Sequence, residues 1–195
     1  MRTSKAGIEL IKQFESCHFK AYRLSGEQFF TIGYGHSYDP EIDANTIWNQ
    51  SQADQALKKD LAKFEKYVET TVKHISLNQN QFDALVSYTY NRGLGGLKQL
   101  ETNSKTVAEY SKNIVKFWGS AVKYKKGLVR RRKAEQELFD RPLKEGLKPG
   151  LSVNEVAIQV IDGKWGTGVT RKNLLVQYGY NPTLIQEEVN RILKG

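Results

Sequence analysis

Apolar residues recur at helical spacing through most of the chain. A short helix near the N-terminus is expected to carry Leu10, Ile11 and Phe14 on one face. Longer stripes follow, with apolar side chains three or four residues apart, the spacing of one helix face. Their members are Ala53, Leu57, Leu61, Phe64 and Val68; then Phe82, Leu85, Val86 and Tyr90; then Val107, Tyr110, Ile114, Phe117 and Trp118. The pattern predicts a mainly helical domain, with the middle stripe stopped at the glycine-rich run 93–96.

One segment near the N-terminus departs from the helical pattern. Residues 28–36, Gln-Phe-Phe-Thr-Ile-Gly-Tyr-Gly-His, are rich in aromatic and β-branched side chains and follow the turn signal Ser25-Gly26. Such a run beside turn residues predicts a strand. The fold class expected for the larger part of the chain is therefore mainly α, an α+β domain with a small N-terminal β-sheet.

The C-terminal region forms a second, smaller unit in this interpretation. Two prolines and two glycines in residues 141–151 predict a linker, assigned to 143–151, between a domain at 1–142 and a module at 152–195. In the module, Ser152 and Glu155 have the spacing of a capping box, and Thr170 is expected to cap a second helix. A third helix begins at Pro182. The module is expected to be a small three-helix bundle.

The charge of the chain is unevenly divided between these two units. The 195 residues carry a formal net charge of +9, which indicates an anionic partner. Residues 149–195 hold five basic and four acidic side chains, so the remainder has a net charge of +8. No apolar run approaches the length of a membrane span, and the N-terminus lacks the apolar core of a signal peptide. We expect a protein made in a reducing cytoplasm, without membrane insertion, cofactor or metal.

Glu15 is the candidate for acid chemistry. It follows Phe14, the last apolar residue of the first helix. A carboxylic acid at the apolar end of a helix loses hydration, and this favours its protonated form. A protonated glutamate is the general acid that glycosidic cleavage requires. On its position alone, a solvated surface glutamate is the favoured interpretation.

Three motifs in order resemble the phage-type lysozymes, family 24 of the glycoside hydrolases. Residues 14–22, Phe-Glu-Ser-Cys-His-Phe-Lys-Ala-Tyr, followed by Thr-Ile-Gly-Tyr-Gly-His at 31–36, resemble the family's opening signature. Residues 77–93 are similar to its Q-F-D-A-L-V-S-F-x-F-N-x-G helix, and residues 127–139 to its G-L-x-x-R-R-x-x-E-x-x-L-F ending. The resemblance implies a lysozyme-like domain and makes Glu15 the catalytic acid.

The resemblance implies further site residues. Thr31 matches the threonine that helps to hold the attacking water, and Tyr34 and Asn91 are candidates for lining the cleft. The family implies hydrolysis of the β-1,4 bond between N-acetylmuramic acid and N-acetylglucosamine with inversion. Such an N-acetylmuramidase would act as a phage endolysin that lyses the host cell.

The family's second carboxylate has no direct counterpart in this chain. The family usually places an Asp or Cys nine residues after the glutamate, and that position is Leu24 here. The interval from there to the threonine is one residue longer than usual. Asp39 and Glu41 are the favoured candidates for activating water, and Glu27 ranks below them. A third route needs no second carboxylate: Glu15 alone would serve a lytic transglycosylase, in which the 6-hydroxyl of the substrate attacks.

The tail resembles the cell-wall-binding repeat CW_7. Residues 152–193 contain nearly every mark of the repeat, including V-I-x-G-x-W-G-x-G and a later V-N pair. The resemblance implies a three-helix bundle that binds the peptidoglycan disaccharide-peptide unit. The candidate wall contacts are Asp162, Lys164, Trp165, Arg171 and Tyr180.

The partners expected from these patterns are wall polymers. Peptidoglycan of a Gram-positive host would be the substrate, reached after holin-type release from the host cytoplasm. The basic run 123–133, with seven positive charges, is either a solvated helix face or a surface attracted to acidic wall polymers. A helix-turn-helix DNA-binding protein, reading with residues 170–178, is the alternative from a different class. The nearly neutral tail argues against it, so we expect no nucleic-acid partner.

Overall fold

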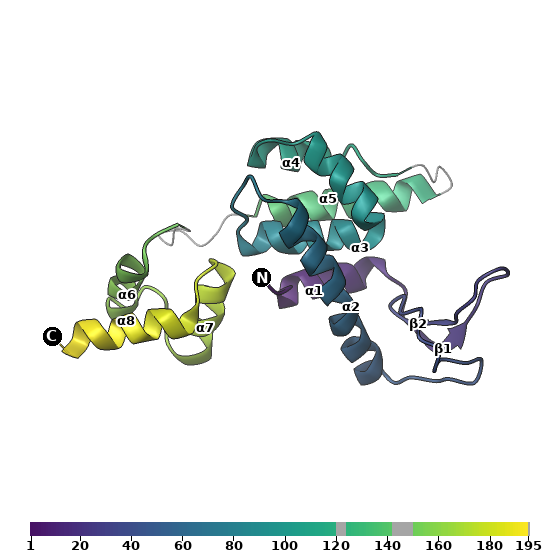
Figure 1. The fold of residues 1–195 in the computed structure, drawn as a ribbon, viewed down its shortest axis with the longest axis horizontal. Helices are drawn as coiled ribbons and strands as arrows, with labels where there is room; N and C mark the ends of the chain where they lie inside the picture. The colour runs from purple at the N-terminus through teal and green to yellow at the C-terminus, as the bar shows by residue number, and fades with distance from the viewer. Residues whose placement is uncertain (120–123, 142–149, 195) are drawn as a thin grey trace.

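The computed structural model describes residues 1–119, 124–141 and 150–194 (Figure 1). Residues 143–149 of the predicted linker therefore lie outside the described residues. In chain order the elements are α1 (Lys5–Phe14), β1 (His18–Tyr22), β2 (Thr31–Gly33), α2 (Gln50–Thr71), α3 (Gln79–Thr102), α4 (Val107–Ile114), α5 (Lys125–Phe139), α6 (Val153–Ile161), α7 (Gly168–Gln177) and α8 (Pro182–Lys194).

Helix α3 is the centre of the larger part, with α1, α2, α4 and α5 packed around it. Its residues Phe82, Leu85 and Val86 are buried in the main apolar cluster, which also takes in the buried faces of α1 and α2. Both long helices begin at an asparagine, Asn49 and Asn78, in a capping box with a glutamine three residues on. The predicted stripes therefore form helices whose apolar faces meet.

Helix α3 does not end at the glycine-rich run, as the sequence pattern predicted. Gly93 leaves helical geometry with φ 65° and ψ −178°, and the helix resumes to Thr102. Leu97 and Leu100, in the resumed segment, are fully buried in the same core. Burial of these two leucines explains why the chain returns to a helix after the break.

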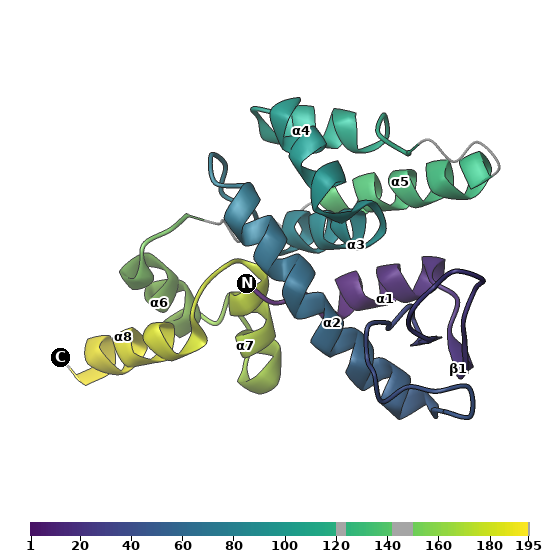
Figure 2. The same cartoon turned by 45° about the vertical axis from the view of Figure 1, so that its right-hand side comes forward.

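The small sheet differs from the predicted strand at 28–36. Only Thr31–Gly33 of that run forms a strand, β2, and it pairs antiparallel with β1. The strand ends early because residues 32 and 36 close a tight turn, in which the N–H of each donates to the carbonyl of the other at 2.9 Å. Strand β1 was not predicted. The small sheet lies at one end of α1 and α2, away from α4 (Figures 1 and 2).

The helix predicted over Val107–Trp118 is shorter in the structure. Helix α4 ends at Ile114, and the N–H of Phe117 donates back to the carbonyl of Asn113. Gly119 then has a φ of 114°, which turns the chain away. Phe117 nevertheless packs against the main core, so its place in the apolar stripe is explained by burial outside the helix.

The tail is a bundle of α6, α7 and α8 with a core of its own. Trp165 is its largest buried side chain. Helix α6 begins with the predicted Ser152–Glu155 capping box, and α8 begins at Pro182. Helix α7 is preceded by Thr167, so the prediction that Thr170 caps it is wrong. In both views the three helices lie on the side of the molecule opposite the sheet (Figures 1 and 2).

Candidate active site

Glu15 lies where the first helix ends. It is the C-cap residue of α1, with an extended backbone, and its N–H donates to the Ile11 carbonyl at 3.0 Å. The side chain of Glu15 is 25% exposed. Leu10 and Ile11 anchor the same helix in the core. The helix therefore presents the carboxylate at the edge of the core, where a ligand can reach it.

Arg131 of α5 forms an ion pair with the Glu15 carboxylate from the buried side. Its Nη1 donates to Glu15 Oε1 at 2.5 Å, while its side chain is only 4% exposed. The other nitrogens are also occupied, since Nε donates to Glu135 Oε1 at 3.0 Å and Nη2 to the Ser87 carbonyl at 3.2 Å. A guanidinium bound on three sides has little rotational freedom. Arg131 thereby fixes the direction in which Glu15 points.

Glu135 and Arg132 complete this buried network. Glu135 is fully buried, and its Oε1 accepts from Ser87 Oγ at 2.8 Å. Arg132 Nε lies 2.7 Å from Glu135 Oε2, and the Arg132 guanidinium lies 4.7 Å from the Tyr88 ring centroid. Two buried arginines share one buried glutamate. The network therefore leaves one positive charge to face the carboxylate of Glu15.

This network changes the interpretation of the basic run 123–133. Arg131 and Arg132 are buried, so the run is neither a uniformly solvated face nor wholly a surface for wall polymers. Glu135, three and four residues further along the helix, supplies their counter-charge. The basic residues of the run that remain exposed are Lys125, Lys126, Arg130 and Lys133. Lys123 lies outside the described residues.

Tyr90 of α3 is hydrogen-bonded to Tyr34, the residue that follows β2. Its hydroxyl donates to the Tyr34 carbonyl at 2.8 Å. Burial raises the pKa of the Tyr90 phenol, and the charges of Asp60 and Glu15 raise it further. Tyr90 also lines a cavity of about 420 Å³ with Asp60, among other residues. Tyr90 is therefore a residue of this cavity wall that lies within electrostatic reach of Glu15.

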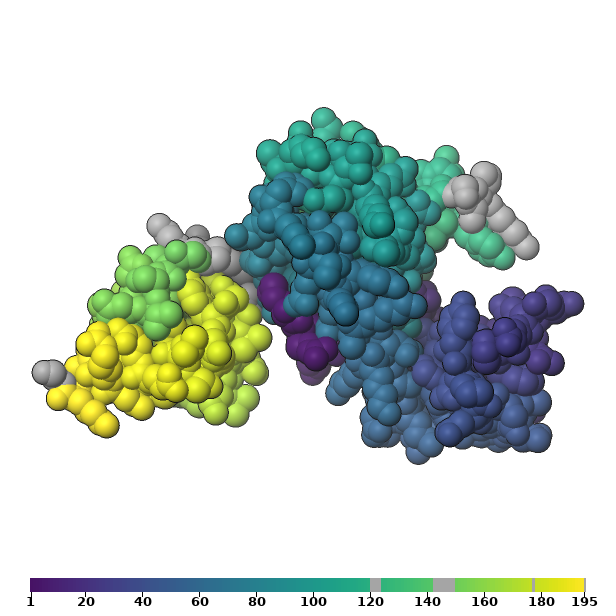
Figure 3. Space-filling view, viewed as in Figure 1, coloured from purple at the N-terminus to yellow at the C-terminus, as the bar shows by residue number. Residues whose placement is uncertain are grey.

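Thr31, at the start of β2, lines a second cavity. This cavity has a volume of about 190 Å³, and its wall includes Glu27, Thr31, Ser37 and Tyr38. Ser37 and Tyr38 also line the cavity of Tyr90, so the two cavities adjoin. Figure 3 shows a recess between the surface of α5 and that of the β1–β2 region. The two cavities form one groove along the edge of the small sheet.

Asp39 and Glu41, the favoured candidates for the second carboxylate, have other surroundings. Asp39 Oδ1 accepts from the Glu41 N–H at 3.0 Å, and His36 Nε2 lies 3.5 Å from Asp39 Oδ2. The Glu41 hydrogen bond, and then His36, lower the pKa of Asp39. His36 in turn contacts Asp60 at 3.0 Å. Neither candidate is part of the wall that Thr31 shares, whereas Glu27 is.

Tyr34 and Asn91 lie in different surroundings. Tyr34 is buried, its hydroxyl accepts from Gln50 Nε2 at 3.0 Å, and it lines an open hollow of about 650 Å³ on another face. Asn91 is exposed on α3, and its Oδ1 accepts from Arg132 Nη2 at 3.0 Å. Of the two, Asn91 is connected to the network beneath Glu15. A cleft-lining role for either stays a prediction.

The aromatic candidates of the tail belong mainly to its core. The Trp165 side chain is fully buried, and its Nε1 donates to Gln159 Oε1 at 3.1 Å. Tyr180 packs edge-on against it with 5.6 Å between ring centroids, and its hydroxyl accepts from the Leu151 N–H at 2.9 Å. Because its indole is fully buried, Trp165 is not accessible for direct contact with a ligand in this structure, and its role in wall binding stays a prediction.

The charged candidates of the tail lie at its surface. Asp162 and Lys164 are exposed and form an ion pair of 3.3 Å. Arg171 lines a cavity of about 410 Å³ with Lys172, Thr183 and other residues of α7 and α8. These three side chains are placed where a ligand can reach them, and their role in wall binding stays a prediction.

The described residues contain neither a membrane-crossing helix nor a metal-binding cluster. No helix among them has the length and apolar character to cross a membrane. No group of three or more His, Cys, Asp or Glu side chains in the described ranges is placed to hold a metal ion.

Comparison with known families places both parts of the chain. Residues 12–135 match the phage lysozyme family, and residues 154–193 match the CW_7 repeat. An endolysin of Bacillus phage PZA is 37% identical over 161 residues, which are 80% of this chain and 62% of the relative. An endolysin of Lactococcus phage c2 is 38% identical over 146 residues, 73% of this chain and 62% of the relative. The chain thus spans somewhat less than two thirds of these curated relatives.

Solved structures agree with this placement. The muramidase domain of SpmX from Asticaccaulis excentricus superimposes with a TM-score of 0.64 at 32% identity, covering 72% of this chain and 99% of that domain. The predicted fold class, mainly helical with a small sheet and lysozyme-like, is confirmed. With a match to more than half of its length and relatives above 30% identity, the chain belongs to the phage lysozyme family, and it carries a CW_7 repeat at its C-terminus.

Proposed function

We propose that this protein is a phage endolysin, an N-acetylmuramidase that hydrolyses the β-1,4 bond after N-acetylmuramic acid in peptidoglycan. One observation carries the proposal. Glu15, the family's catalytic position, is a quarter exposed at the end of α1 and is fixed by Arg131, which is itself buried. A reactive carboxylate on a rigid support is what a glycosidase needs to act on one defined bond.

Glu15 would protonate the glycosidic oxygen as the bond to C1 of the muramic residue breaks. Thr31, in the adjoining part of the groove, would hold the water that attacks C1 from the opposite face. An attacking water must lose a proton, so a carboxylate base is required on that face. Asp39, Glu41 and Glu27 are the candidates in this part of the chain.

The two parts of the chain would divide the work. The catalytic domain, over residues 1–142, carries most of the net charge, and the exposed part of its basic run would attract it to acidic wall polymers. The module at 152–195 would bind peptidoglycan through Asp162, Lys164, Arg171 and the polar end of Tyr180. The relatives from Bacillus and Lactococcus phages support a Gram-positive host. The enzyme would be made in the host cytoplasm and would reach the wall after release.

A Glu15→Gln variant tests the activity. Glutamine keeps the shape of the side chain but supplies no acidic proton, so clearing of purified walls should fall at least about 100-fold. The matched control is Glu137→Gln, an exposed glutamate on α5, which should clear walls at the normal rate. Undiminished cleavage by Glu15→Gln would contradict the proposal.

The products distinguish hydrolysis from its rivals. Mass spectrometry of digested peptidoglycan should find muramic acid at the reducing end. A 1,6-anhydro product would instead identify a lytic transglycosylase. A gel shift at moderate salt addresses the DNA-binding alternative, because phosphate contacts give an affinity that falls steeply with salt; we expect no specific shift.

A further inference from the structure

We propose that Glu27 is the second catalytic carboxylate, and that a tight turn brings it beside Leu24. The inference deepens the proposed function and rests on it. Leu24 occupies the position where the resembled family has its Asp or Cys, and it is 62% exposed. Its side chain has no group that can accept a proton, so the chemistry needs a carboxylate from a neighbouring residue.

The backbone around Leu24 folds back on itself. The N–H of Glu27 donates to the Leu24 carbonyl at 3.1 Å, which closes a four-residue turn. The third residue of the turn is Gly26, with φ 88°, a value that glycine adopts without strain. The segment is one residue longer than the family usually has between this position and the threonine.

The side chain of Glu27 folds back in the same direction. Its Oε2 accepts from the backbone N–H of Leu24 at 3.0 Å. The carboxylate therefore lies beside the backbone of position 24, although it comes from three residues further along. In the described part of the chain, no protein hydrogen bond is formed by the other oxygen, Oε1. One oxygen is anchored, and the other can accept a proton from a ligand or a water.

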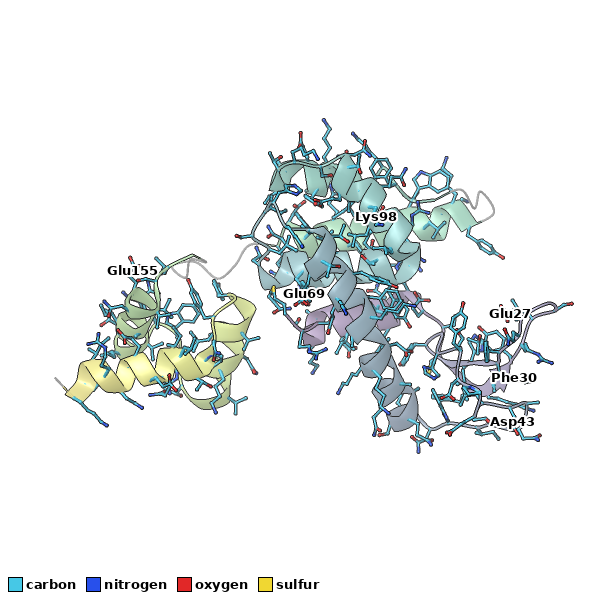
Figure 4. The ribbon with its side chains drawn as sticks, in the orientation of Figure 1. Glu27, Phe30, Asp43, Glu69, Lys98 and Glu155 are labelled. Atoms are coloured by element: carbon cyan, nitrogen blue, oxygen red, sulfur yellow. The ribbon has the colours of Figure 1, made fainter. Side chains whose placement is uncertain are left out.

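Glu27 faces the same cavity as Thr31. Both lie in the wall of the 190 Å³ cavity, which has ample room for a water molecule. This cavity adjoins the one lined by Tyr90, whose pKa responds to the charge of Glu15. In Figure 4, Glu27 is labelled at the top of the β1–β2 region and Asp43 at the bottom of it. Glu27 and Thr31 therefore line one cavity, and the adjoining cavity is lined by Tyr90, which lies within electrostatic reach of Glu15.

The rival carboxylates lack this placement. Asp39 is bound by the Glu41 N–H and by His36, which ties it to Asp60 on α2. Glu41 lines neither of the two cavities, as far as their walls are described. Of the three candidates from the sequence, Glu27 is the one that shares a cavity with Thr31.

The proposed step balances with water as the co-reactant. The oxygen of a water held between Thr31 and Glu27 forms a bond to C1 of the muramic residue while the bond from C1 to the leaving oxygen breaks. The water gives one proton to Glu27, and Glu15 gives its proton to the leaving oxygen. The products are a muramic residue with a new 1-hydroxyl and a glucosamine with a free 4-hydroxyl. Proton exchange with solvent restores both carboxyl groups.

The test compares Glu27→Gln with a control variant of the β1–β2 region, both made in the full chain. Glutamine can still accept from the Leu24 N–H through its amide oxygen, so the turn is kept while the base is lost. General-base catalysis is worth about 10²–10⁴-fold, so the kcat for muramic release from purified peptidoglycan should fall at least about 100-fold with little change in KM. The matched control is Asp43→Asn, an exposed carboxylate that caps a loop through Thr46 and Asn45, which should keep normal activity.

Chemical rescue with azide distinguishes the loss of a catalytic base from the loss of a structural contact. Sodium azide is a nucleophile that needs no base, so it should restore turnover of Glu27→Ala and yield a glycosyl azide, while leaving Glu15→Gln inactive. A lost structural role would not be restored by azide. A Glu27→Gln variant that keeps more than about a tenth of the wild-type kcat overturns the inference. The inference is also overturned if kcat falls about 100-fold in Asp39→Asn or Glu41→Gln while Glu27→Gln stays fully active.

The proposed function and the inference on Glu27 can be overturned by different results. If the wild-type chain releases reducing-end muramic acid and needs Glu15 but not Glu27, the proposed function stands and only the inference on Glu27 is overturned. If the wild-type product is the 1,6-anhydro sugar, or Glu15→Gln is fully active, the proposed function is itself overturned and Glu27 loses its role with it.

Discussion

The larger part of the chain places charged groups in its interior, whereas the tail has an apolar interior and carries its charges outside. Beneath Glu15 lie Ser87, Arg131, Arg132 and Glu135, all buried. The tail core consists of Val156, Ala157, Val160, Trp165, Leu175, Tyr178, Ile185 and Val189. Burying charges has a desolvation cost that only close pairing offsets. In the larger part, the buried charges hold the carboxylate of Glu15 in a fixed position. In the tail, the charged side chains Asp162 and Lys164 lie at the surface, outside the apolar core.

The largest expected effect comes from breaking the buried network. Glu135→Ala removes the counter-charge of two buried arginines, so the free energy of unfolding should fall by about 3–5 kcal/mol. Glu15 would also lose its fixed support, and wall clearing should fall with it. Denaturant unfolding, followed by fluorescence, measures the first effect.

The control for that change lies on the same helix. Glu137→Ala alters an exposed glutamate two residues further along and should shift the free energy by less than about 0.5 kcal/mol. Equal stabilities for the two variants would contradict the idea that the network holds the larger part together.

In the tail, the corresponding change is to an apolar residue. Trp165→Ala leaves a cavity in a small core and should cost about 3 kcal/mol or more, enough to unfold a module of this size. Sedimentation with purified walls should lose the protein, while cleavage of short soluble glycans should stay normal because the catalytic core is separate. Val169→Ala, at a side chain 73% exposed, is the matched control. Loss of both activities in Trp165→Ala would show that the two cores are coupled.

A smaller difference concerns pH, since all three histidines belong to the larger part. The hydrogen bond with Asp60, and then Asp39, raises the pKa of His36. A raised histidine pKa stabilises the fold below the unfolded value near 6.5, and this stabilisation is lost as the pH rises through the folded pKa. The wild-type protein should lose no more than about 1 kcal/mol over that rise. Asp60→Asn should flatten the dependence, as stability curves at successive pH values would reveal; an unchanged slope would contradict the assignment.

The smallest effect on stability is expected at the tail surface. Asp162→Asn together with Lys164→Gln removes an exposed ion pair, and such pairs contribute little to folding. The melting temperature should be unchanged, while the affinity for walls should decrease if these residues contact the ligand. Normal wall affinity would remove both residues from the candidate contacts.

The helices were predictable because two local signals agree on them. The apolar stripes of α2 and α3 have helical spacing, and each helix begins with an asparagine capping box. Strand β1 gave no comparable signal, because it is only five residues long, with Ala21 buried and the other side chains exposed. Its position depends on pairing with β2, a long-range contact that a local pattern does not contain.

The site was predictable in part. Glu15 and Thr31 followed from the family resemblance, while the support by Arg131 was missed. A signal for it existed, because two arginines three and four residues before a glutamate on one helix are placed to pair with it. Asp39 and Glu41 ranked above Glu27 because they follow the 31–36 run and could come round the sheet. The sequence places Glu27 in a turn, but it does not show that the carboxylate folds back to the Leu24 N–H, since that depends on the local geometry.

The break at Gly93 also limits how this family member can vary. With φ 65° and ψ −178°, the residue lies in a region of backbone conformation that only glycine enters freely, and any other side chain there costs on the order of 1–3 kcal/mol. In a library of all amino acids at each position, only glycine should be tolerated at residue 93, although a Cβ atom there would meet nothing within 4 Å. The constraint comes from the path of the main chain and not from crowding, so enlarging the space around residue 93 would not relieve it.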